Sequence, residues 1–503
     1  AENYPDAGEK QKKILTEKLL KDILLREGDN VQTSITKVQQ NIDGATGSRR
    51  KTPYLLASDS FHFYQLTQQL LETGRISETI QGSKYLNTLM LAPKGHFEPI
   101  TLHPYVGAIC YRLLRQWRPA MDLMEALGYV PLILSGLSLM AFLAVCYVMN
   151  SALWSTFIGS IFFFCSPIFI KRSAYGWYDN DPYNTLFPLL ILGVLFTAFG
   201  RTPSLRRSVM VLCSLSVLML VYALFWQGWM MMFMVAGIGL GIVTLYSRFM
   251  ERSPSTAKQE GLVLGGFGIL TFVLIGLAFG PKEFFLLFQE GYKALQNFLV
   301  PQLSLWPDLY ISVGELHQAN LFEIVVITGG FIFTGLALAG LIFSFFRWRN
   351  PQHSRQFKMV VVLAVFLGMS ILITLGAQRF ALLCLTPLSL LCVLGMDHFL
   401  ALGDGFSGKF ANIPLRRGAW LAVRLVLATA VISPLLTLQR QMPKLLNPIY
   451  NDTWDAALVD IAEGTPQNSI INSWWPPGHF IKATARRRVT FDGATINFPQ
   501  AYW

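Results

Sequence analysis

Carboxylates recur beside long apolar segments at three separate places in the sequence. Asp179 and Asp181 flank a single residue just before one apolar segment. Asp59 opens a helix-like stretch, and Glu315 closely precedes another apolar segment. Hard divalent cations such as Mg²⁺ and Mn²⁺ prefer several oxygen ligands of this kind. The pattern therefore indicates a candidate metal site, although Asp-x-Asp spacing also occurs in solvated turns and helix caps.

Two other features could bind a substrate. Arg379 stands alone at the start of an apolar segment. A lone arginine there commonly reaches to lipid headgroups, although its planar guanidinium also suits a phosphate. Trp474 and Trp475 follow a short Ile-rich strand, in which adjacent side chains point in opposite directions. One tryptophan can therefore pack inward, while the other anchors at a membrane interface or forms part of a ligand platform.

Membrane helices are the elements that must position these residues. The 503-residue chain is 52% hydrophobic and 14% charged, which is too apolar for an ordinary soluble protein. Its apolar residues come in blocks of about twenty, the length needed to cross a bilayer. The sequence predicts a polytopic α-helical membrane protein with spans at about residues 128–148, 152–170, 183–199, 208–225, 227–246, 261–279, 322–346, 359–377, 380–398 and 418–437.

The net charge of +11 is explained by membrane topology rather than by a nucleic-acid partner. Lys and Arg collect in the cytoplasmic loops of membrane proteins, and no basic stripe with interleaved aromatic residues marks a nucleic-acid-binding domain. The cationic residues gather after alternate spans, in the stretches 201–207, 248–258, 347–358 and 409–417. We therefore assign these stretches to the cytoplasmic side and the candidate site residues to the outer face. The cysteines lack CxxC spacing, so neither a disulfide framework nor a zinc site is indicated.

This topology divides the chain into regions. They are an outer first-loop region with helices (1–127), transmembrane helices (128–279), a long outer loop (280–321), further transmembrane helices (322–437) and the start of a small C-terminal α/β soluble domain (438–503). Because the chain starts on the outer face, we expect an omitted preceding span or a cleaved signal peptide. Residues 8–42 have helical apolar spacing, which predicts either a packed helical hairpin or a docking site for a partner chain.

Five short stretches, taken in order, carry a family resemblance. They are Ser58–Tyr64 (SDSFHFY), Gly176–Asp181 (GWYDND), Ser312–Glu315 (SVGE), Gly376–Phe380 (GAQRF) and Ser473–Gly478 (SWWPPG). With these motifs the chain resembles the catalytic subunit of oligosaccharyltransferase, a membrane glycosyltransferase of the GT-C superfamily. The resemblance implies the GT-C fold in a bacterial or archaeal cytoplasmic membrane, or in the ER membrane of a eukaryote. It places the active site on the outer, periplasmic or lumenal face.

The resemblance also implies a reaction and a metal site. A glycan would pass from a polyprenyl (pyro)phosphate lipid donor to an acceptor polypeptide, next to the membrane lipids. Asp59 and Glu315 would be catalytic and would contact the acceptor amide. The metal, Mg²⁺ or Mn²⁺, would be held by Asp59, Asp179, Asp181 and Glu315. The long outer loop would close over the acceptor and bring in Glu315, as catalytic lids do.

The two substrates account for the remaining motifs, with one departure from the family. The resemblance implies that Arg379 binds the donor phosphate and that Trp474 and Trp475 bind the acceptor. Pro476 stands where the family has the aspartate of Trp-Trp-Asp-Tyr-Gly, which reads the hydroxyl of the Asn-x-Ser/Thr sequon. Proline offers neither a carboxylate nor a backbone N–H. The acceptor is therefore open to a serine, another sequon-like peptide or a non-protein molecule.

Two other functions compete with this hypothesis. A GT-C relative could transfer sugar from a polyprenyl monophosphate to a lipid or polysaccharide, and the same aspartates would be expected there. A transporter or scaffold is disfavoured, because transporters place ionisable residues near the bilayer midplane. Here the acids lie at the outer edges of the spans.

Overall fold

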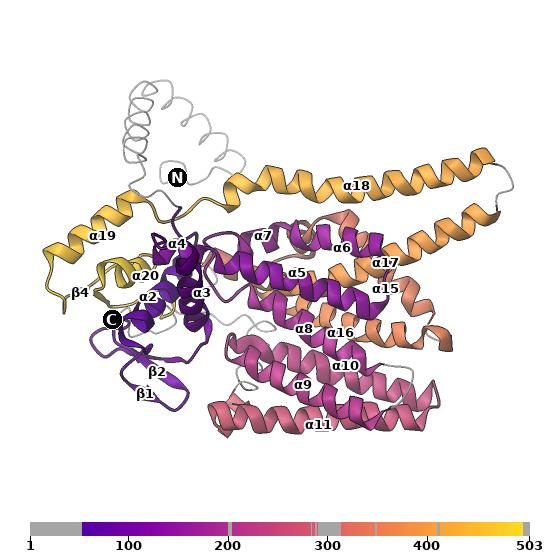
Figure 1. The fold of residues 1–503 in the computed structure, drawn as a ribbon, viewed down its shortest axis with the longest axis horizontal. Helices are drawn as coiled ribbons and strands as arrows, with labels where there is room; N and C mark the ends of the chain where they lie inside the picture. Colours follow the sequence, from indigo (N-terminus) through magenta and orange to yellow (C-terminus); the bar gives the residue numbers. More distant parts are fainter. Residues whose placement is uncertain are drawn as a thin grey trace, which may run out of the picture.

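A bundle of long helices forms the body of the protein, and an outer region lies at one end of it (Figure 1). The computed structural model describes residues 53–199, 204–282, 284–286, 289, 313–347, 350–409 and 413–495. In Figure 1 the bundle helices run side by side, and α2, α3, α19 and α20 gather beyond their ends. The bundle and the outer region therefore meet where the spans end on one side.

The bundle helices are apolar around most of their circumference, as expected for helices in contact with lipid and with one another. Their bounds are α4 Leu123–Gly128, α5 Val130–Met149, α6 Leu153–Phe164, α7 Pro167–Ser173, α8 Tyr183–Ala198, α9 Leu205–Ala223, α10 Met230–Phe249, α11 Pro254–Phe279, α14 Leu321–Thr328, α15 Phe331–Phe346, α16 Ser354–Gly376, α17 Ala381–Lys409 and α18 Ile413–Leu445. Short 3₁₀ turns join some of them: η1 Gln227–Trp229, η2 Gly314–Leu316, η3 Pro351–His353 and η4 Gln378–Phe380. A helix satisfies its own backbone hydrogen bonds, which allows these segments to lie in hydrocarbon.

The spans confirm a polytopic membrane protein but differ from the prediction in detail. Among the described residues, seven helices are long and apolar enough to cross a membrane, or up to nine if each of two bent pairs counts as one span. The helix α8 has 16 residues and is shorter than a full span. The pairs α6–α7 and α14–α15 are bent by 62° and 100°. Each of the segments predicted as one span at 152–170 and 322–346 is therefore divided into two helices by a bend.

Local backbone chemistry explains both bends. Pro167 begins α7 and has no N–H to continue the preceding helix. Ser166 caps the new helix, because its side chain accepts a hydrogen bond from the N–H of Phe169 at 3.3 Å. Gly329 and Gly330 have φ angles of +130° and +92°, which glycine adopts far more readily than other residues. Hydropathy indicates the length of an apolar segment but does not reveal such turns.

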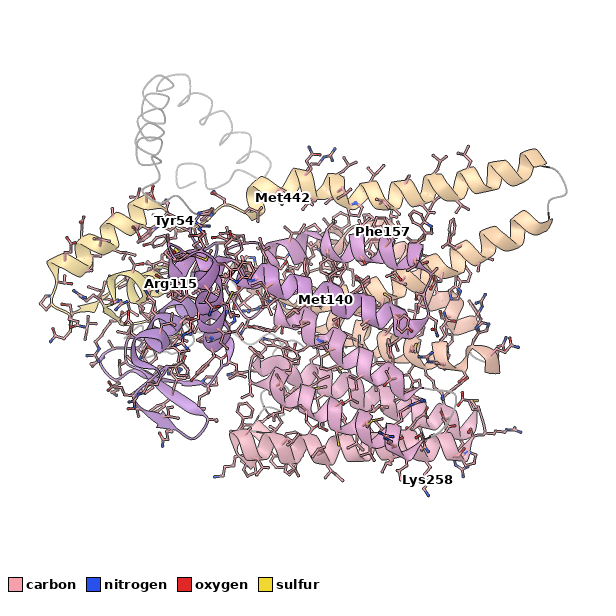
Figure 2. The ribbon with its side chains drawn as sticks, in the orientation of Figure 1. Tyr54, Arg115, Met140, Phe157, Lys258 and Met442 are labelled. Atoms are coloured by element: carbon pink, nitrogen blue, oxygen red, sulfur yellow. The ribbon has the colours of Figure 1, made fainter. Side chains whose placement is uncertain are left out.

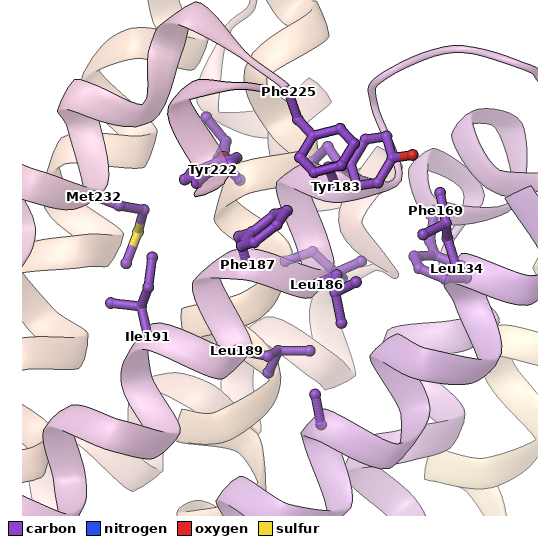
Figure 3. Close-up of a cluster of buried hydrophobic side chains, with 14 of the residues drawn as sticks. Leu134, Phe169, Tyr183, Leu186, Phe187, Leu189, Ile191, Tyr222, Phe225 and Met232 are labelled. Atoms are coloured by element: carbon purple, nitrogen blue, oxygen red, sulfur yellow. The ribbon is translucent and has the colours of Figure 1, made fainter. Parts of the chain in front are cut away.

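An aromatic cluster fixes the start of α8, just after Asp181. Figure 3 shows Tyr183 and Phe187 of α8 beside Tyr222 of α9 and Phe225, which follows α9. The rings of Tyr183 and Phe225 stack with centroids 4.1 Å apart, and those of Phe187 and Tyr222 stack 5.0 Å apart. Such pairs contribute about 0.5–1.5 kcal/mol each beyond their buried area. The cluster therefore holds the loop before α8 against the bundle.

The outer region combines segments from before and after the bundle. The first part contains α2 Ser58–Thr73, α3 His103–Trp117 and an antiparallel sheet of β1 Ile80–Gln81, β2 Lys84–Asn87 and β3 His96–Pro99. The second part contains α19 Asp452–Gly464, α20 Gly478–Phe480, a π-helical turn Ile481–Ala485, and the parallel pair β4 Ile470–Ile471 and β5 Arg488–Val489. The strands expected in the C-terminal segment are thus only two residues long.

The two parts of the outer region pack through aromatic side chains. The ring of Phe61 on α2 lies 4.6 Å from that of Tyr450 and 4.8 Å from that of Phe480. The hydroxyl of Tyr54 donates a hydrogen bond to Asp452 at 2.5 Å. In Figure 1 the helix α20 accordingly lies beside α2. The segment after the bundle is therefore part of the structure that carries Asp59.

A close crossing of α15 and α17 depends on two glycines. A Cβ on Gly340 would lie 2.0 Å from the carbonyl oxygen of Leu391, and a Cβ on Gly395 would lie 2.0 Å from that of Leu336. Small residues let membrane helices approach this closely, so that their backbones pack directly. Gly335, also on α15, has open space where its Cβ would be.

We expect Gly340→Ala to destabilise the bundle by about 1–3 kcal/mol, because the added methyl group overpacks the crossing. Gly335→Ala serves as the matched control on the same helix and should leave stability unchanged or slightly higher, since alanine is the better helix former. Denaturation of both purified variants in detergent, followed by tryptophan fluorescence, measures the difference. Equal stability of the two variants would contradict the close crossing.

Candidate functional site

Asp59 is positioned by a contact between two loops. It lies in the first turn of α2, where the helix N-terminus favours a negative charge. Just before α2, the N–H of Leu56 donates to the carbonyl oxygen of Gly176 at 2.9 Å. Gly176 has a φ of +88°, and a Cβ there would lie 3.2 Å from the carbonyl oxygen of Tyr54. Glycine therefore lets the start of α2 lie against the loop that carries the next two acids.

Asp179 and Asp181 are both buried in the loop between α7 and α8, but their partners differ. Asp181 Oδ2 accepts hydrogen bonds from Arg172 Nη1 at 2.7 Å and from Trp177 Nε1 at 3.2 Å. Among the described residues, Asp179 accepts a hydrogen bond only from the backbone N–H of Asn180, at 2.6 Å. Asp181 is therefore paired with a cation through hydrogen bonds, and Asp179 is not.

Glu315 and Arg379 come from two further segments. Glu315 Oε2 contacts the second terminal nitrogen of Arg172, and Glu315 Oε1 lies 3.8 Å from Arg379 Nη1. The turns that carry them, η2 and η4, are joined because the N–H of Gln378 donates to the carbonyl oxygen of His317 at 2.9 Å. Arg172 therefore bridges the acid on η2 and the loop before α8.

The four acids lie close enough together to alter one another's proton affinity. Burial, and then the charges of Asp181 and Asp59, raise the pKa of Asp179 well above its usual range. Partial burial and then the charge of Glu315 raise the pKa of Asp59. Burial alone would raise the pKa of Asp181 as well, but the charges of Arg172 and Arg379 and the hydrogen bonds from Arg172 and Trp177 together lower it. The four acids thus lie in one region of the structure, close enough to influence one another electrostatically.

The charge of this cluster suits a divalent cation, although the present arrangement of its side chains does not enclose one. Within the ranges that the structure describes, no three Asp, Glu, His or Cys side chains are grouped so that they could hold an ion. Arg172 instead bridges two of the acids. The four carboxylates outnumber the two arginines that pair with them, and buried Asp179 receives no hydrogen bond from a described cation. An oxygen-rich site with excess negative charge fits a hard divalent cation.

The two candidate acceptor residues lie between β4 and α20. Trp474 is 46% exposed, and its ring meets Phe491 edge to face at 6.3 Å. Trp475 is half-buried, and its Nε1 is buried without a hydrogen-bond partner among the described residues. Leaving such a donor unpaired costs roughly 1–3 kcal/mol, which a ligand carbonyl could offset. The residue next in sequence to this pair, Pro476, contributes no polar side chain.

A second set of charged side chains lies on the other side of Asp59. His479 Nε2 is 3.6 Å from Asp59 Oδ1, and His479 Nδ1 is 3.5 Å from Asp492 Oδ2. Lys482 forms an ion pair with the same oxygen of Asp492. The side chains of His479, Lys482 and Asp492 are all buried. Burial lowers the pKa of His479 well below its usual range. Burial would raise the pKa of Asp492, but the charges of Lys482 and the neighbouring histidines, with the hydrogen bond from Lys482, together lower it.

Sequence reasoning did not identify these residues or Arg172 as part of the site. Arg172 did carry a weak signal, because it is one of few cations between spans on the predicted outer face. His479 immediately follows the quoted Trp-Trp-Pro-Pro-Gly motif, but a single histidine predicts no particular partner. Lys482 and Asp492 are ten positions apart, which gives no local signal. Residues 8–42, the predicted partner-docking segment, and residues 290–312 of the outer loop lie outside the described residues.

Comparison with known families and sequences gives a consistent result. Residues 47–442 match the family model described as Oligosaccharyl transferase STT3, N-terminal. The chain is 23% identical to a dolichyl-phosphooligosaccharide-protein glycotransferase of Methanococcus voltae, over 90% of this chain and 59% of that protein. It is 25% identical to the protein of the same name from Methanocaldococcus jannaschii, over 48% of this chain and 32% of the relative. The chain thus spans about three fifths of the first relative's length.

Solved structures show the same fold. The archaeal oligosaccharyltransferase AglB from Archaeoglobus fulgidus, in complex with an inhibitory peptide and a dolichol-phosphate, has a TM-score of 0.63 and 14% identity, over 89% of this chain and 62% of its own. ArnT from Cupriavidus metallidurans, bound to undecaprenyl phosphate, has a TM-score of 0.51 and 11% identity, over 92% of this chain and 85% of its own. These similarities confirm the predicted GT-C membrane fold.

The different surroundings of Asp179 and Asp181 predict opposite effects of one substitution in chelator-treated protein. The folded-state pKa of Asp179 is raised, so its ionisation destabilises the fold increasingly as pH rises above the usual Asp range. Asp179→Asn should therefore raise the unfolding midpoint at pH 7. The folded-state pKa of Asp181 is lowered, so its charge stabilises the fold until pH falls through that lowered value. Asp181→Asn should lower the free energy of unfolding by about 1.5–3 kcal/mol at pH 7, because it removes the hydrogen bonds to the charged carboxylate.

Thermal unfolding of both variants between pH 5 and 8 measures this difference, and each serves as the other's control. Shifts of the same sign at pH 7 would show that the two carboxylates do not differ as described.

Proposed function

The chain belongs to the oligosaccharyl transferase STT3 family, and from this premise we propose that it transfers a glycan from a polyprenyl (pyro)phosphate lipid to an acceptor polypeptide at the outer face of the membrane. The observation that carries the proposal is the convergence of Asp59, Asp179, Asp181, Glu315 and Arg379 beside the ends of the spans. The names of the archaeal relatives describe transfer from a dolichyl-phosphooligosaccharide to protein. The A. fulgidus relative was solved with a dolichol-phosphate and a peptide.

The distribution of positive charge supports the outer location. Figure 2 shows Tyr54 and Arg115 at one end of the molecule and Lys258 toward the opposite end of the bundle. The stretch that contains Lys258 belongs to the Lys- and Arg-rich side, which is cytoplasmic in membrane proteins. The acid cluster lies near Tyr54, because Leu56 bonds to the loop that carries Asp179. The proposed site is therefore on the outer face.

Arg379 is the proposed partner of the donor phosphate. It lies on η4, directly before α17, so its guanidinium is near the end of a helix that is long and apolar enough to be a span. Its side chain is 28% exposed, and its ion pair with Glu315 is long. Arginine forms strong paired hydrogen bonds with phosphate oxygens. A lipid phosphate entering from the bilayer would therefore reach a guanidinium that is partly accessible and only weakly held.

Asp59 and Glu315 are the proposed partners of the acceptor amide. The side chain of Asp59 is 43% exposed, unlike the buried Asp179, so a substrate can reach it. Both carboxylates would accept hydrogen bonds from the acceptor nitrogen and orient it toward the sugar. This role is positional, since a correctly held nucleophile loses less entropy in the reaction.

The four acids are also the proposed ligands of Mg²⁺ or Mn²⁺. A related A. fulgidus structure was determined with Zn and sulfate, which supports a divalent metal in general. When bound, such an ion stabilises charge that develops on phosphate oxygens. In the structure, Arg172 holds Asp181 and Glu315 at this place. This arginine would keep the two acids together until the ion is bound.

Acceptor recognition is the part of the function in which this chain departs from the family pattern. Pro476 cannot accept a hydrogen bond from a Ser or Thr hydroxyl through a carboxylate. We infer that the acceptor is bound without a requirement for that hydroxyl, and that the Trp475 Nε1–H donates to an acceptor carbonyl instead. The same residue favours one alternative, in which a polyprenyl-phosphate sugar is transferred to a lipid or polysaccharide.

Charge removal at the two catalytic acids tests the reaction. Asp59→Asn and Glu315→Gln should each lower glycan transfer by at least about 10²-fold, because each removes a charge placed at the reacting groups. EDTA should abolish transfer, and Mn²⁺ or Mg²⁺ should restore it. The assay uses the full chain in lipid nanodiscs with a polyprenyl pyrophosphate oligosaccharide and a peptide library, and mass spectrometry of the products.

Glu78→Gln is the matched control, since Glu78 is an exposed acid of the same outer region. Undiminished turnover in both active-site variants would contradict the proposal. A glycan found on lipid or polysaccharide, and on no peptide, would establish the alternative acceptor.

Pro476→Asp tests acceptor recognition with peptides that differ only in Thr or Ala two residues after the asparagine. The unmodified chain should glycosylate both peptides at similar rates. The variant should prefer the Thr peptide by roughly 10–100-fold, because a buried hydrogen bond to a charge is worth about 1.5–3 kcal/mol. Pro477→Asp is the control and should confer no preference. A strong Thr preference in the unmodified chain would contradict the inferred recognition.

A further inference from the structure

His479 is a buried histidine placed between two carboxylates from different parts of the chain. It is 2% exposed, its Nε2 lies 3.6 Å from Asp59 Oδ1, and its Nδ1 lies 3.5 Å from Asp492 Oδ2. It lies on α20, after the last long helix, whereas Asp59 lies on α2, before the first. The contact therefore links the start of α2 to the segment that follows the bundle.

The neighbours of the two carboxylates indicate which ring nitrogen carries the hydrogen. Asp492 Oδ1 already accepts from the N–H groups of Ala494 and Thr495 and from the Thr495 hydroxyl, at 3.0–3.2 Å. Its Oδ2 is ion-paired with Lys482. The Asp59 side chain, in contrast, accepts only one hydrogen bond from a described residue, the Ser58 hydroxyl at 3.2 Å. Asp59 is therefore the carboxylate with more acceptor capacity left for a ring N–H of His479.

Two glycines make room for this contact. A Cβ on Gly493 would lie 2.8 Å from His479 Nε2 and 3.7 Å from Asp59 Oδ1. A Cβ on Gly478 would lie 2.6 Å from the Cβ of Asp492. Any side chain at either position would push the imidazole or its anionic neighbour away. The backbone is thus shaped around the ring of His479.

Lys482 joins the same assembly to α2 at a second point. Its Nζ lies 3.3 Å from Nδ1 of His62, which is one helical turn after Asp59. The Nε2 of His62 in turn lies 3.6 Å from Glu98 on β3. The start of α2 is therefore contacted at two residues, Asp59 and His62, by side chains that follow the bundle.

We propose that His479 is a positioning residue: its Nε2 approaches Asp59 Oδ1 at 3.6 Å, and closing this short gap would let Nε2–H donate to the carboxylate and hold it toward the other acids. The proposal rests on the role given to Asp59 in the proposed function. Asp492 and Lys482 would keep the imidazole in place, and Gly493 would keep the path between the two side chains clear. The histidine itself touches neither substrate.

The test uses variants of His479 that separate its two nitrogens. The amide nitrogen of Gln reaches about as far as Nε2, whereas that of Asn reaches about as far as Nδ1. His479→Gln should therefore keep most of the transfer rate. His479→Ala and His479→Asn should lower kcat and the affinity for Mn²⁺ by about 10–100-fold, as is usual when a group that orients a ligand is removed. The KM for the acceptor peptide should not change.

Transfer kinetics with a defined peptide, and electron paramagnetic resonance of Mn²⁺ titrated into the full chain in nanodiscs, provide these measurements. His398→Gln is the control, because His398 is also buried but lies near the opposite end of α17, bonded to Ser344 at 2.9 Å. It should leave kcat and Mn²⁺ affinity unchanged. Equal losses in the Gln, Asn and Ala variants at His479 would indicate a merely structural role and overturn the proposal.

Gly493→Ala provides an independent variant if substitution at His479 prevents folding. Its methyl group would come between the two side chains while leaving both chemically intact. It should lower kcat and Mn²⁺ affinity in the same direction as His479→Ala. Gly464→Ala, which has open space around its Cβ, is the matched control and should change neither. Unchanged Mn²⁺ affinity and kcat in Gly493→Ala would overturn the proposal.

A double-mutant cycle separates this proposal from the proposed function. Melting temperatures of chelator-treated protein are compared for His479→Ala, Asp59→Asn and the double variant. Non-additive shifts are expected, because the two side chains interact directly. If the unmodified chain transferred no glycan while the cycle stayed non-additive, the proposed function would fail and the contact would stand. Additive shifts would overturn the contact itself.

Discussion

Mutual repulsion among the carboxylates is the constraint on which the arrangement of this site depends. Asp59, Asp179, Asp181 and Glu315 come from three distant segments, and two of them are buried. Like charges brought together at low dielectric repel strongly. Arg172 makes the arrangement possible by bridging the acid on η2 and the acid before α8. Without a metal ion, the arginine side chains offset part of the repulsion among the carboxylates. A bound metal ion would take over part of this role.

The bundle and the outer region contribute different properties to the site. The aromatic stack between α8 and α9 fixes the loop before α8, so that Asp181 is anchored from the membrane side. The segment after α18 packs on α2 through Phe480 and Tyr450, so that Asp59 is anchored from the outer side. Glu315 is held mainly by ion pairs with arginines. It is therefore the acid whose position can change with least disturbance to the packing.

Much of the fold could be predicted from the sequence, because apolar length and the placement of Lys and Arg are local properties. The spans, and the acids at their edges, were found in this way. The bends at Pro167 and Gly329 were missed, since hydropathy averages over turns. Arg172 and His479 were missed for another reason. Their partners Glu315 and Asp59 are 143 and 420 positions away, and a single sequence contains no record of such pairings.

The packing of the post-bundle segment on α2 has a consequence for biosynthesis. Asp59 leaves the ribosome more than four hundred residues before Asp492 does. At about 5–20 residues per second, that interval is roughly 20–90 seconds. During this time the start of α2, which carries Asp59, lacks its contacts with His479 and Lys482. On the role proposed for His479, Asp59 would be held in position only after nearly all of the described segment had been made.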